Sequence, residues 1–298
     1  MILIAGGTGS LGTQVVRLLT ARGLAVRILT RDPAHAAHLR NDLVELVKGD
    51  VLDPHAVELA AAGARTVISA IHGFSGSGAY NPRTVDWQGN RALIRAAQAS
   101  GAEHFILVSI QGVVPDHPME LFRMKYQAEQ DVHASSLAWS IIRPTAYMET
   151  WAKLLGEPLI KSGTTWIFGR GTNPISFVSV YDVAQFVELA VVDPAMRGVL
   201  VEVGGPENLS MRQFVQTFET VTGRRGTKRS VPLPLMRLMA VLMRALNPML
   251  ARQIQAGVVM DTWDMAFDPS DTRRCYPAIA LTSLAEAVRR DYGAGACC

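Results

Sequence analysis

A glycine-rich segment near the start of the chain limits the possible folds more than any other part of the sequence. Gly6-Gly7-Thr8-Gly9-Ser10-Leu11-Gly12 follows a short apolar run at Met1–Ala5 and opens an amphipathic stretch at Leu11–Ala21. Glycines allow a tight turn and let the backbone approach a pyrophosphate, whose charge is attracted by the N–H groups at a helix N-terminus. In this strand–loop–helix setting the segment predicts a dinucleotide-binding loop, and the alternative is an ordinary glycine turn.

Short apolar runs alternate with longer amphipathic stretches through the first half of the chain. Runs that are rich in β-branched residues and lack polar alternation are typical of strands covered on both faces. The expected strands are Met1–Ala5, Ala25–Thr30, Val44–Val47, Thr66–Ala70, Phe105–Ser109 and Ser140–Ile142, and the expected helices are Leu11–Ala21, Pro54–Ala61, Arg83–Ser100 and Glu120–Ser135. This order predicts a Rossmann-type α/β fold, a doubly wound parallel sheet, in a domain at residues 1–150.

The pattern becomes less regular in the second half, where we expect a smaller C-terminal α+β substrate lobe at residues 151–298, interleaved with the first domain. Residues 156–173 contain several glycines and few helical signals. Ser210 and Gln213 are spaced as a capping box, which predicts a helix that runs to about Thr222. Further elements are expected at Ile175–Val178, Val180–Val192, Val199–Val203, Leu235–Leu246, Ala251–Val259 and Ser283–Asp291.

Composition excludes several classes of protein. Of the 298 residues, 49% are apolar and 18% are charged, so a large core can form and global disorder is excluded. The 29 basic and 26 acidic residues leave a net charge of +3, which is too small to indicate nucleic-acid binding. Cys275, Cys297 and Cys298 are too few for a disulfide scaffold and fit a cytoplasmic protein. We expect no metal site, no signal peptide and no membrane-spanning helix.

The residue after the second expected strand indicates which dinucleotide binds. NAD sites commonly place an acid there for the ribose hydroxyls, whereas NADP sites place a cation for the 2′-phosphate. Arg31 follows Thr30 and can bind the phosphate with its fork of donors. Asp32 is the competing residue, but Pro33 behind it indicates that the chain has already left the strand. We therefore expect NADP(H) rather than NAD, and the alternative for Arg31 is a solvated surface arginine.

Several segments together resemble one superfamily. They are GGTGSLG at 6–12, Thr30-Arg31-Asp32-Pro33, Gly49-Asp50-Val51, Ser69-Ala70-Ile71, Val108-Ser109, Lys125 with Glu129, Ile142–Ala146 and Phe177–Ala184. With these segments the chain resembles the NmrA-like branch of the atypical short-chain dehydrogenases/reductases over most of its length.

The resemblance implies which residues contact the cofactor. Asp50 and Val51 would hold the adenine, and Ala70 and Ile71 would line the middle of the dinucleotide. His72 follows the fourth expected strand, where it could face the nicotinamide of the cofactor and act on a substrate, but a satisfied loop histidine is favoured. For Asp50 the alternative is an ordinary turn residue after Gly49.

The resemblance also implies a nicotinamide end of the site. Lys125 would donate to the ribose hydroxyls there, and the segment from Pro144 to Tyr147 would pass near the ring. The alternative for Lys125 is a helix lysine paired with Glu129 four residues later.

One element of the superfamily's catalytic machinery is absent from its usual place. The main branch uses Tyr-x-x-x-Lys, in which the lysine lowers the pKa of a tyrosine on the same helical face. Leu121 stands four residues before Lys125, and Tyr126 points about 100° away around the helix. Ser109 and Tyr147 are the remaining candidates for a catalytic hydroxyl, with a turn cap and a packing residue as their alternatives.

These observations leave two classes of function open. The first is an NADP(H)-dependent oxidoreductase for a small apolar acceptor that needs little proton donation, such as a quinone or an enone. The second is a non-catalytic NADP(H)-binding redox sensor or assembly factor, and sugar-nucleotide epimerisation ranks last because it needs the missing tyrosine. We expect a monomer or a homodimer without a nucleic-acid partner.

Two surface segments have no assigned role at this stage. The basic cluster Arg224, Arg225, Lys228 and Arg229 is expected to be a solvated loop. The Met-rich stretch at residues 235–250 is expected to pack in the core, and the alternatives are a lid over the substrate, a dimer face and a peripheral membrane contact.

Overall fold

The computed structural model describes residues 1–293, in which the chain forms two compact units. The first unit contains Met1–Arg143 and Val183–Glu202, and the second contains Pro144–Asp182 and the chain from Val203 onward. The chain therefore leaves the first unit, returns to it and leaves it again. Cys297 and Cys298 lie outside the described residues.

A seven-stranded sheet forms the centre of the first unit. Its strands are β1 (Ile2–Ala5), β2 (Val26–Thr30), β3 (Val44–Lys48), β4 (Thr66–Ser69), β5 (His104–Val108), β6 (Ala138–Pro144) and β10 (Val199–Val203). They are arranged in the order β10-β6-β5-β4-β1-β2-β3, and the pairs β1–β2, β2–β3, β1–β4, β4–β5 and β5–β6 are parallel. The predicted doubly wound parallel sheet is confirmed.

The strand order reverses between β1 and β4, which are neighbours in the middle of the sheet. In such sheets ligands bind outside the carboxyl ends of the strands at this switch point. The loops that follow the two strands touch there. Gly6, just after β1, has a φ of +87°, and a β-carbon on it would lie 2.5 Å from the carbonyl oxygen of Ala70, just after β4. The fold therefore predicts a ligand site where these two loops meet.

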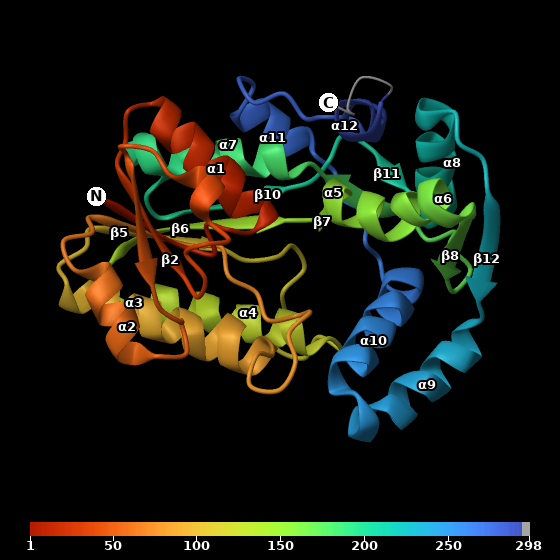
Figure 1. The fold of residues 1–298 in the computed structure, drawn as a ribbon, viewed down its shortest axis with the longest axis horizontal. Helices are drawn as coiled ribbons and strands as arrows, with labels where there is room; N and C mark the ends of the chain where they lie inside the picture. Colours follow the sequence, from red (N-terminus) through yellow and green to blue (C-terminus); the bar gives the residue numbers. More distant parts are fainter. Residues whose placement is uncertain (294–298) are drawn as a thin grey trace. The chain divides into compact units, whose positions relative to one another are not determined.

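Helices cover both faces of this sheet. Figure 1 shows α1 (Ser10–Ala21) and α7 (Val180–Val192) on one face, and α2 (Pro54–Ala61), α3 (Asn90–Ala99) and α4 (Glu120–His133) on the other. The expected helix at Arg83–Ser100 begins as a π-helix, η2 (Pro82–Gly89), and continues as α3. Short 3₁₀ turns lie at Ala37–Leu39 and Pro194–Met196.

The second unit combines two small sheets with helices. One sheet has the order β11-β9-β7, and the other pairs β12 with β8. The strands are β7 (Ala146–Tyr147), β8 (Thr164–Phe168), β9 (Ile175–Val178), β11 (Asn208–Leu209) and β12 (Thr227–Val231). The helices are α5 (Met148–Trp151), η3 (Ala152–Gly156), α6 (Glu157–Ser162), α8 (Met211–Thr222), α9 (Leu233–Leu246), α10 (Pro248–Thr262), α11 (Ser270–Cys275) and α12 (Leu284–Tyr292). The side chains of Phe177, Phe214 and Phe218 form the centre of its core.

One expectation for this unit is wrong. Residues 156–173, which have few helical signals in the sequence, contain α6 and then β8. The basic cluster is not wholly a loop, because Lys228 and Arg229 lie in β12, which pairs in parallel with β8. Most side chains of β12 are exposed, so the strand has no apolar alternation that could reveal it in the sequence.

The capping box at Ser210 and Gln213 is confirmed. No helix within residues 1–293 is both long enough and apolar enough to cross a bilayer.

Candidate dinucleotide-binding site

The glycine loop ends at the N-terminus of α1, where Gly9 is the N-cap residue. Gly9 donates its N–H to the carbonyl of Gly6 at 3.1 Å and accepts the first helical hydrogen bond from Thr13 at 2.9 Å. It has no side chain to cap the helix, and the first turn carries no acidic residue. Gly9 and Ser10 are exposed. The positive end of α1 is thus directed at solvent beside the ends of β1 and β4, as an anion site requires.

The three spaced glycines of the loop differ in what requires them. A β-carbon on Gly12 would lie 2.1 Å from the carbonyl oxygen of Gly6 and 2.6 Å from the Cα of Gly7, so backbone packing excludes any side chain there. Gly6 needs both its positive φ and its close approach to Ala70. A β-carbon on Gly9 would meet only the Gly6 oxygen at 3.4 Å, and its φ of −76° suits any residue. Neither packing nor conformation explains this glycine, and its expected contact with a pyrophosphate stays a prediction.

Arg31 extends from the end of β2 and stacks on an aromatic ring. Its guanidinium carbon lies 4.5 Å from the centroid of Tyr80, within the range of a cation–π contact. Asp32 turns to its own backbone, because its carboxylate accepts hydrogen bonds from the N–H groups of Ala34 and His35 at 2.9 and 3.3 Å. Arg31 is therefore exposed and braced, while the competing acid caps a turn.

The residues expected to hold the adenine lie next to the same aromatic ring. The Asp50 carboxylate accepts a hydrogen bond from the Tyr80 hydroxyl at 2.6 Å and another from the N–H of Leu52 at 3.0 Å. Arg31, Tyr80 and Asp50 thus form a connected row. Val51 and Ile71 also converge, since a β-carbon on Gly89 would lie 3.2 Å from the first side chain and 3.3 Å from the second.

Lys125 is almost fully buried and is bound by the protein itself. Its ammonium donates to the carbonyls of Ile71 and Val108 at 2.9 and 3.0 Å, and it lies 3.2 Å from a carboxylate oxygen of Asp86. The other oxygen of Asp86 accepts a hydrogen bond from the N–H of Gly73 at 2.7 Å. Lys125 therefore ties the ends of β4 and β5 to η2. Its contact with a ribose stays a prediction, and the alternative partner Glu129 is bound by Arg143 instead.

Ser109 and His72 lie at the ends of the same two strands. The Ser109 hydroxyl is buried and has no hydrogen-bond partner among residues 1–293, although the Ser109 N–H donates to the carbonyl of Ile142 at 2.8 Å. Unsatisfied buried hydroxyls are rare in native proteins, so this hydroxyl has a hydrogen bond left to form. His72 lies in the loop that follows β4, where the surrounding protein desolvates its ring. This desolvation lowers the pKa of His72, the Asp86 carboxylate opposes the shift and the Lys125 ammonium adds to it.

Pro144 and Tyr147 belong to the second unit, so their expected place near the nicotinamide stays a prediction. Burial raises the pKa of Tyr147, and the nearby Glu149 carboxylate raises it further, so this phenol is protonated at neutral pH. Glu149 itself is bound by the Ser179 hydroxyl at 2.7 Å and by Arg290 at 2.9 Å.

Tyr80, Asp86 and Asn90 were not predicted from the sequence. Asn90 donates to the backbone carbonyl of Asp86 at 2.7 Å and accepts from Ser69 at 2.5 Å, which fixes η2 to the end of β4. The one available signal was the spacing of Asp86 and Asn90, which puts two polar residues on one face of an amphipathic helix. Tyr80 has no local signal, because its partners are distant in sequence.

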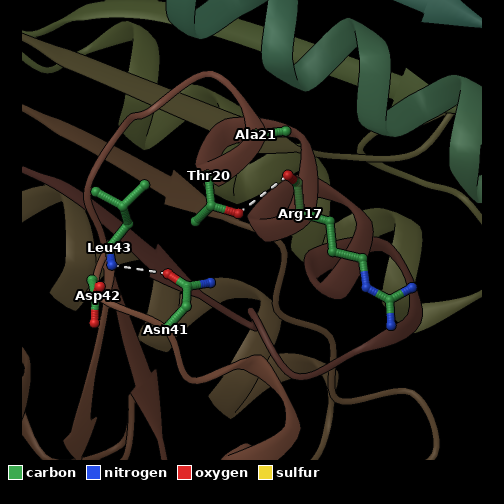
Figure 2. Close-up of a pocket in the computed structure, with 6 residues that line it drawn as sticks. All are labelled: Arg17, Thr20, Ala21, Asn41, Asp42 and Leu43. Carbon is green, nitrogen blue, oxygen red and sulfur yellow. Dashed lines mark hydrogen bonds between the residues drawn. The ribbon is translucent and has the colours of Figure 1, made fainter.

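A depression in the surface of the first unit is unrelated to the glycine loop. Figure 2 shows it between the C-terminal turn of α1 and the turn at Asn41–Leu43. Its polar side chains are satisfied locally: Thr20 donates to the backbone carbonyls of Val16 and Arg17, and Asn41 accepts from the N–H of Leu43 at 2.8 Å. The helix separates it from Gly9 by roughly 15 Å.

The sheet order, the switch point and the loop before α1 define the class of Rossmann-type α/β proteins. The sequence model of the NmrA-like family matches residues 1–256, and the chain belongs to this family.

Its relatives differ in what their names describe. The chain is 29% identical over 225 residues to an NAD(P)H azoreductase of Xenophilus azovorans, with 75% of this chain and 74% of that protein covered. It is 27% identical over 238 residues to the photosystem II assembly factor Ycf39 of Synechocystis, with 80% and 72% covered. In structure it is similar to an NADPH complex of the quinone oxidoreductase QOR2 from Escherichia coli. That comparison has a TM-score of 0.77 at 21% identity and covers 97% of this chain and 98% of the other.

Proposed function

We propose that this chain binds NADP(H) and uses it to reduce a small apolar acceptor such as a quinone, an enone or a dye. The observation that carries the proposal is the exposed N-cap of α1 at Gly9, where a glycine is needed for neither conformation nor packing. The names of two relatives, an azoreductase and a quinone oxidoreductase, support reduction of such acceptors.

The residues of the first unit fit the parts of the dinucleotide. The N–H groups at the start of α1 would hold the pyrophosphate, and Arg31, braced on Tyr80, would bind the 2′-phosphate. Asp50 and Val51 would border the adenine. The buried Ser109 hydroxyl has a hydrogen bond to offer a ligand at the end of β5. When bound, NADPH supplies a hydride.

The side chains of this site limit the acceptors it can serve. Leu121 stands where a tyrosine would donate a proton, and the Lys125 ammonium is engaged by three protein oxygens. A quinone or an enone suits such a site, because the oxygen that gains charge on reduction can take its proton from water. A ketone without conjugation needs a stronger donor and is disfavoured.

The cofactor part of the proposal is tested by calorimetry with NADPH and NADH. Arg31→Glu should weaken NADPH binding by about 10- to 100-fold, the value of a lost charged contact, and should affect NADH much less. Arg40→Glu, at another exposed arginine close by in the sequence, is the matched control and should change neither. Equal weakening of both coenzymes would remove the 2′-phosphate role of Arg31.

Turnover is tested by following NADPH oxidation with a panel that contains a benzoquinone, an azo dye and a conjugated enone. Oxidation whose KM for NADPH rises in Gly9→Val supports the reductase. A second candidate, an NADP(H)-binding assembly or sensor protein, is favoured by the fully engaged Lys125 and by the Ycf39 relative. Tight NADPH binding without oxidation by any member of the panel would select that candidate.

A further inference from the structure

Helix α9 carries an apolar surface that the other described residues of the second unit do not cover. Leucine and valine side chains on this helix are between 46% and 77% exposed, and they are Leu235, Leu238, Val241, Leu242 and Leu246. In α9 only Met236 and Ala240 are buried. An ordinary surface helix buries its apolar residues and exposes its polar ones, so α9 has an excess of apolar residues on its outer face.

The contact that holds α9 is narrow. Figure 1 shows α9 beside α10, to which it is joined by a short connection at Asn247. The helices approach closely at Met236, since a β-carbon on Gly257 would lie 2.7 Å from the Met236 methyl group. At 100° per residue, the exposed residues from Val241 through Leu238 to Leu246 span about 140° of the helix surface. This arc is separate from the buried stripe and contains only apolar side chains.

Charge around this arc has one sign. Residues 220–260 include seven arginines and lysines and no aspartate or glutamate. Arg237 and Arg244 are both exposed. With Leu235 at 0° on the same helical projection they lie at about 200° and 180°, next to the edge of the arc that Val241 forms. In β12, which precedes α9, Lys228 pairs with Glu219 of α8, and Arg229 lies over the exposed ring of Trp166. A leucine-rich arc with arginines at its edge is typical of a helix that lies in a membrane interface, where long basic side chains reach the headgroups.

We propose that α9 docks this chain on an anionic lipid surface, with the five exposed apolar side chains among the acyl chains and Arg237 and Arg244 at the headgroups. A second copy is disfavoured, because an antiparallel two-fold contact of this helix would bring the basic edges of two chains together. A protein groove is disfavoured as well, because the arc contains no aromatic residue, and leucine and valine rarely dominate protein interfaces. The proposal does not depend on the proposed reductase activity.

The test uses the full chain and sedimentation with vesicles of phosphatidylcholine, either pure or with 30% phosphatidylglycerol. We expect binding to the anionic vesicles, much weaker binding to the neutral ones, and a decrease at high salt. Leu238→Gln/Leu242→Gln should lower the partition coefficient by about 20-fold, and Arg237→Gln/Arg244→Gln by a similar factor. Leu59→Gln is the matched control, because Leu59 is 60% exposed on α2 of the first unit.

The outcomes separate a lipid surface from a second copy of the chain. Vesicle binding that fails in both α9 variants and persists in Leu59→Gln supports the lipid surface. No binding to anionic vesicles, or binding that the α9 variants leave unchanged, overturns it. A concentration-dependent dimer that Leu238→Gln/Leu242→Gln dissociates would assign the face to a second copy and also overturn it. Val241→Gln/Leu246→Gln provides a second apolar variant if the first fails to fold.

Discussion

The loop before α1 allows binding and folding to be separated with two single substitutions. A β-carbon at Gly9 would meet only the Gly6 oxygen, at 3.4 Å, so the cost of Gly9→Val to folding is limited to a poorer N-cap, about 1 kcal/mol. Gly12→Ala forces a β-carbon to within 2.1 Å of a backbone oxygen, an overpacking that we expect to cost about 3 kcal/mol. At about 2–4 °C per kcal/mol, the first change should lower Tm by no more than about 4 °C and the second by about 6–12 °C.

The loss of dinucleotide binding in Gly9→Val should be much larger than its small loss of stability suggests. Gly9→Val crowds the surface where the pyrophosphate would meet the helix N-terminus, and the loss of one charged hydrogen bond is worth about 1.5–3 kcal/mol. The Kd for NADPH should therefore rise by about 10- to 150-fold while Tm stays close to that of the wild type. Calorimetry and thermal unfolding on the same preparations measure both quantities. A stable Gly9→Val protein that binds NADPH as tightly as the wild type would refute the assignment of this loop.

Three further predictions concern the first unit. Lys125→Met should lower the free energy of unfolding by about 3–5 kcal/mol in denaturant titration, because it leaves the buried Asp86 carboxylate without its cation. Adding Asp86→Asn should restore part of the loss, and a change below about 1 kcal/mol for Lys125→Met alone would contradict the buried pair. Tyr80→Phe keeps the ring under Arg31 and should preserve the preference for NADPH over NADH, whereas Tyr80→Leu should reduce this preference about two- to fivefold in calorimetry. Equal effects of the two substitutions would show that the ring does not act through Arg31. Burial, and to a lesser degree Arg197, lowers the pKa of His104 to about 4. The stability that neutral His104 contributes is therefore complete above pH 6.5 and is lost as the pH falls toward 4, by up to about 3 kcal/mol. His104→Leu should reduce the pH dependence of the free energy of unfolding across this range, and an unchanged dependence would count against the buried neutral ring.

The strands of the central sheet could be predicted because burial on both faces leaves a clear signal. Each of β1, β2 and β4 is a run of four or five residues without polar alternation, and the structure places all three within one residue of the expected bounds. β12 gave no such signal, because its residues are mostly polar and exposed and the strand forms by pairing with β8. Two-residue strands such as β7 are likewise set by their neighbours and not by their own composition.

The parts of the candidate site that depend on local backbone structure could be predicted from the sequence. The glycine spacing and the position of Arg31 after β2 follow from local sequence, and the structure brings them to the same end of the sheet. Tyr80 and Asp86 could not be found this way, since their partners Asp50 and Lys125 are 30 and 39 residues away in the chain. The expected role of Lys125 follows from the resemblance to the superfamily, whereas the buried environment of its ammonium depends on the tertiary fold.

The interleaving of the two units has a consequence for synthesis on the ribosome. The central sheet lacks its edge strand β10 until residue 203 has been translated, and by then the chain has already made β7, β8 and β9 of the other unit. A fragment that stops near residue 150 would expose the flank of β6 as an unpaired strand edge, which favours aggregation. Attempts to express the nucleotide-binding half alone should therefore join residues 1–143 to 183–203 through a designed linker.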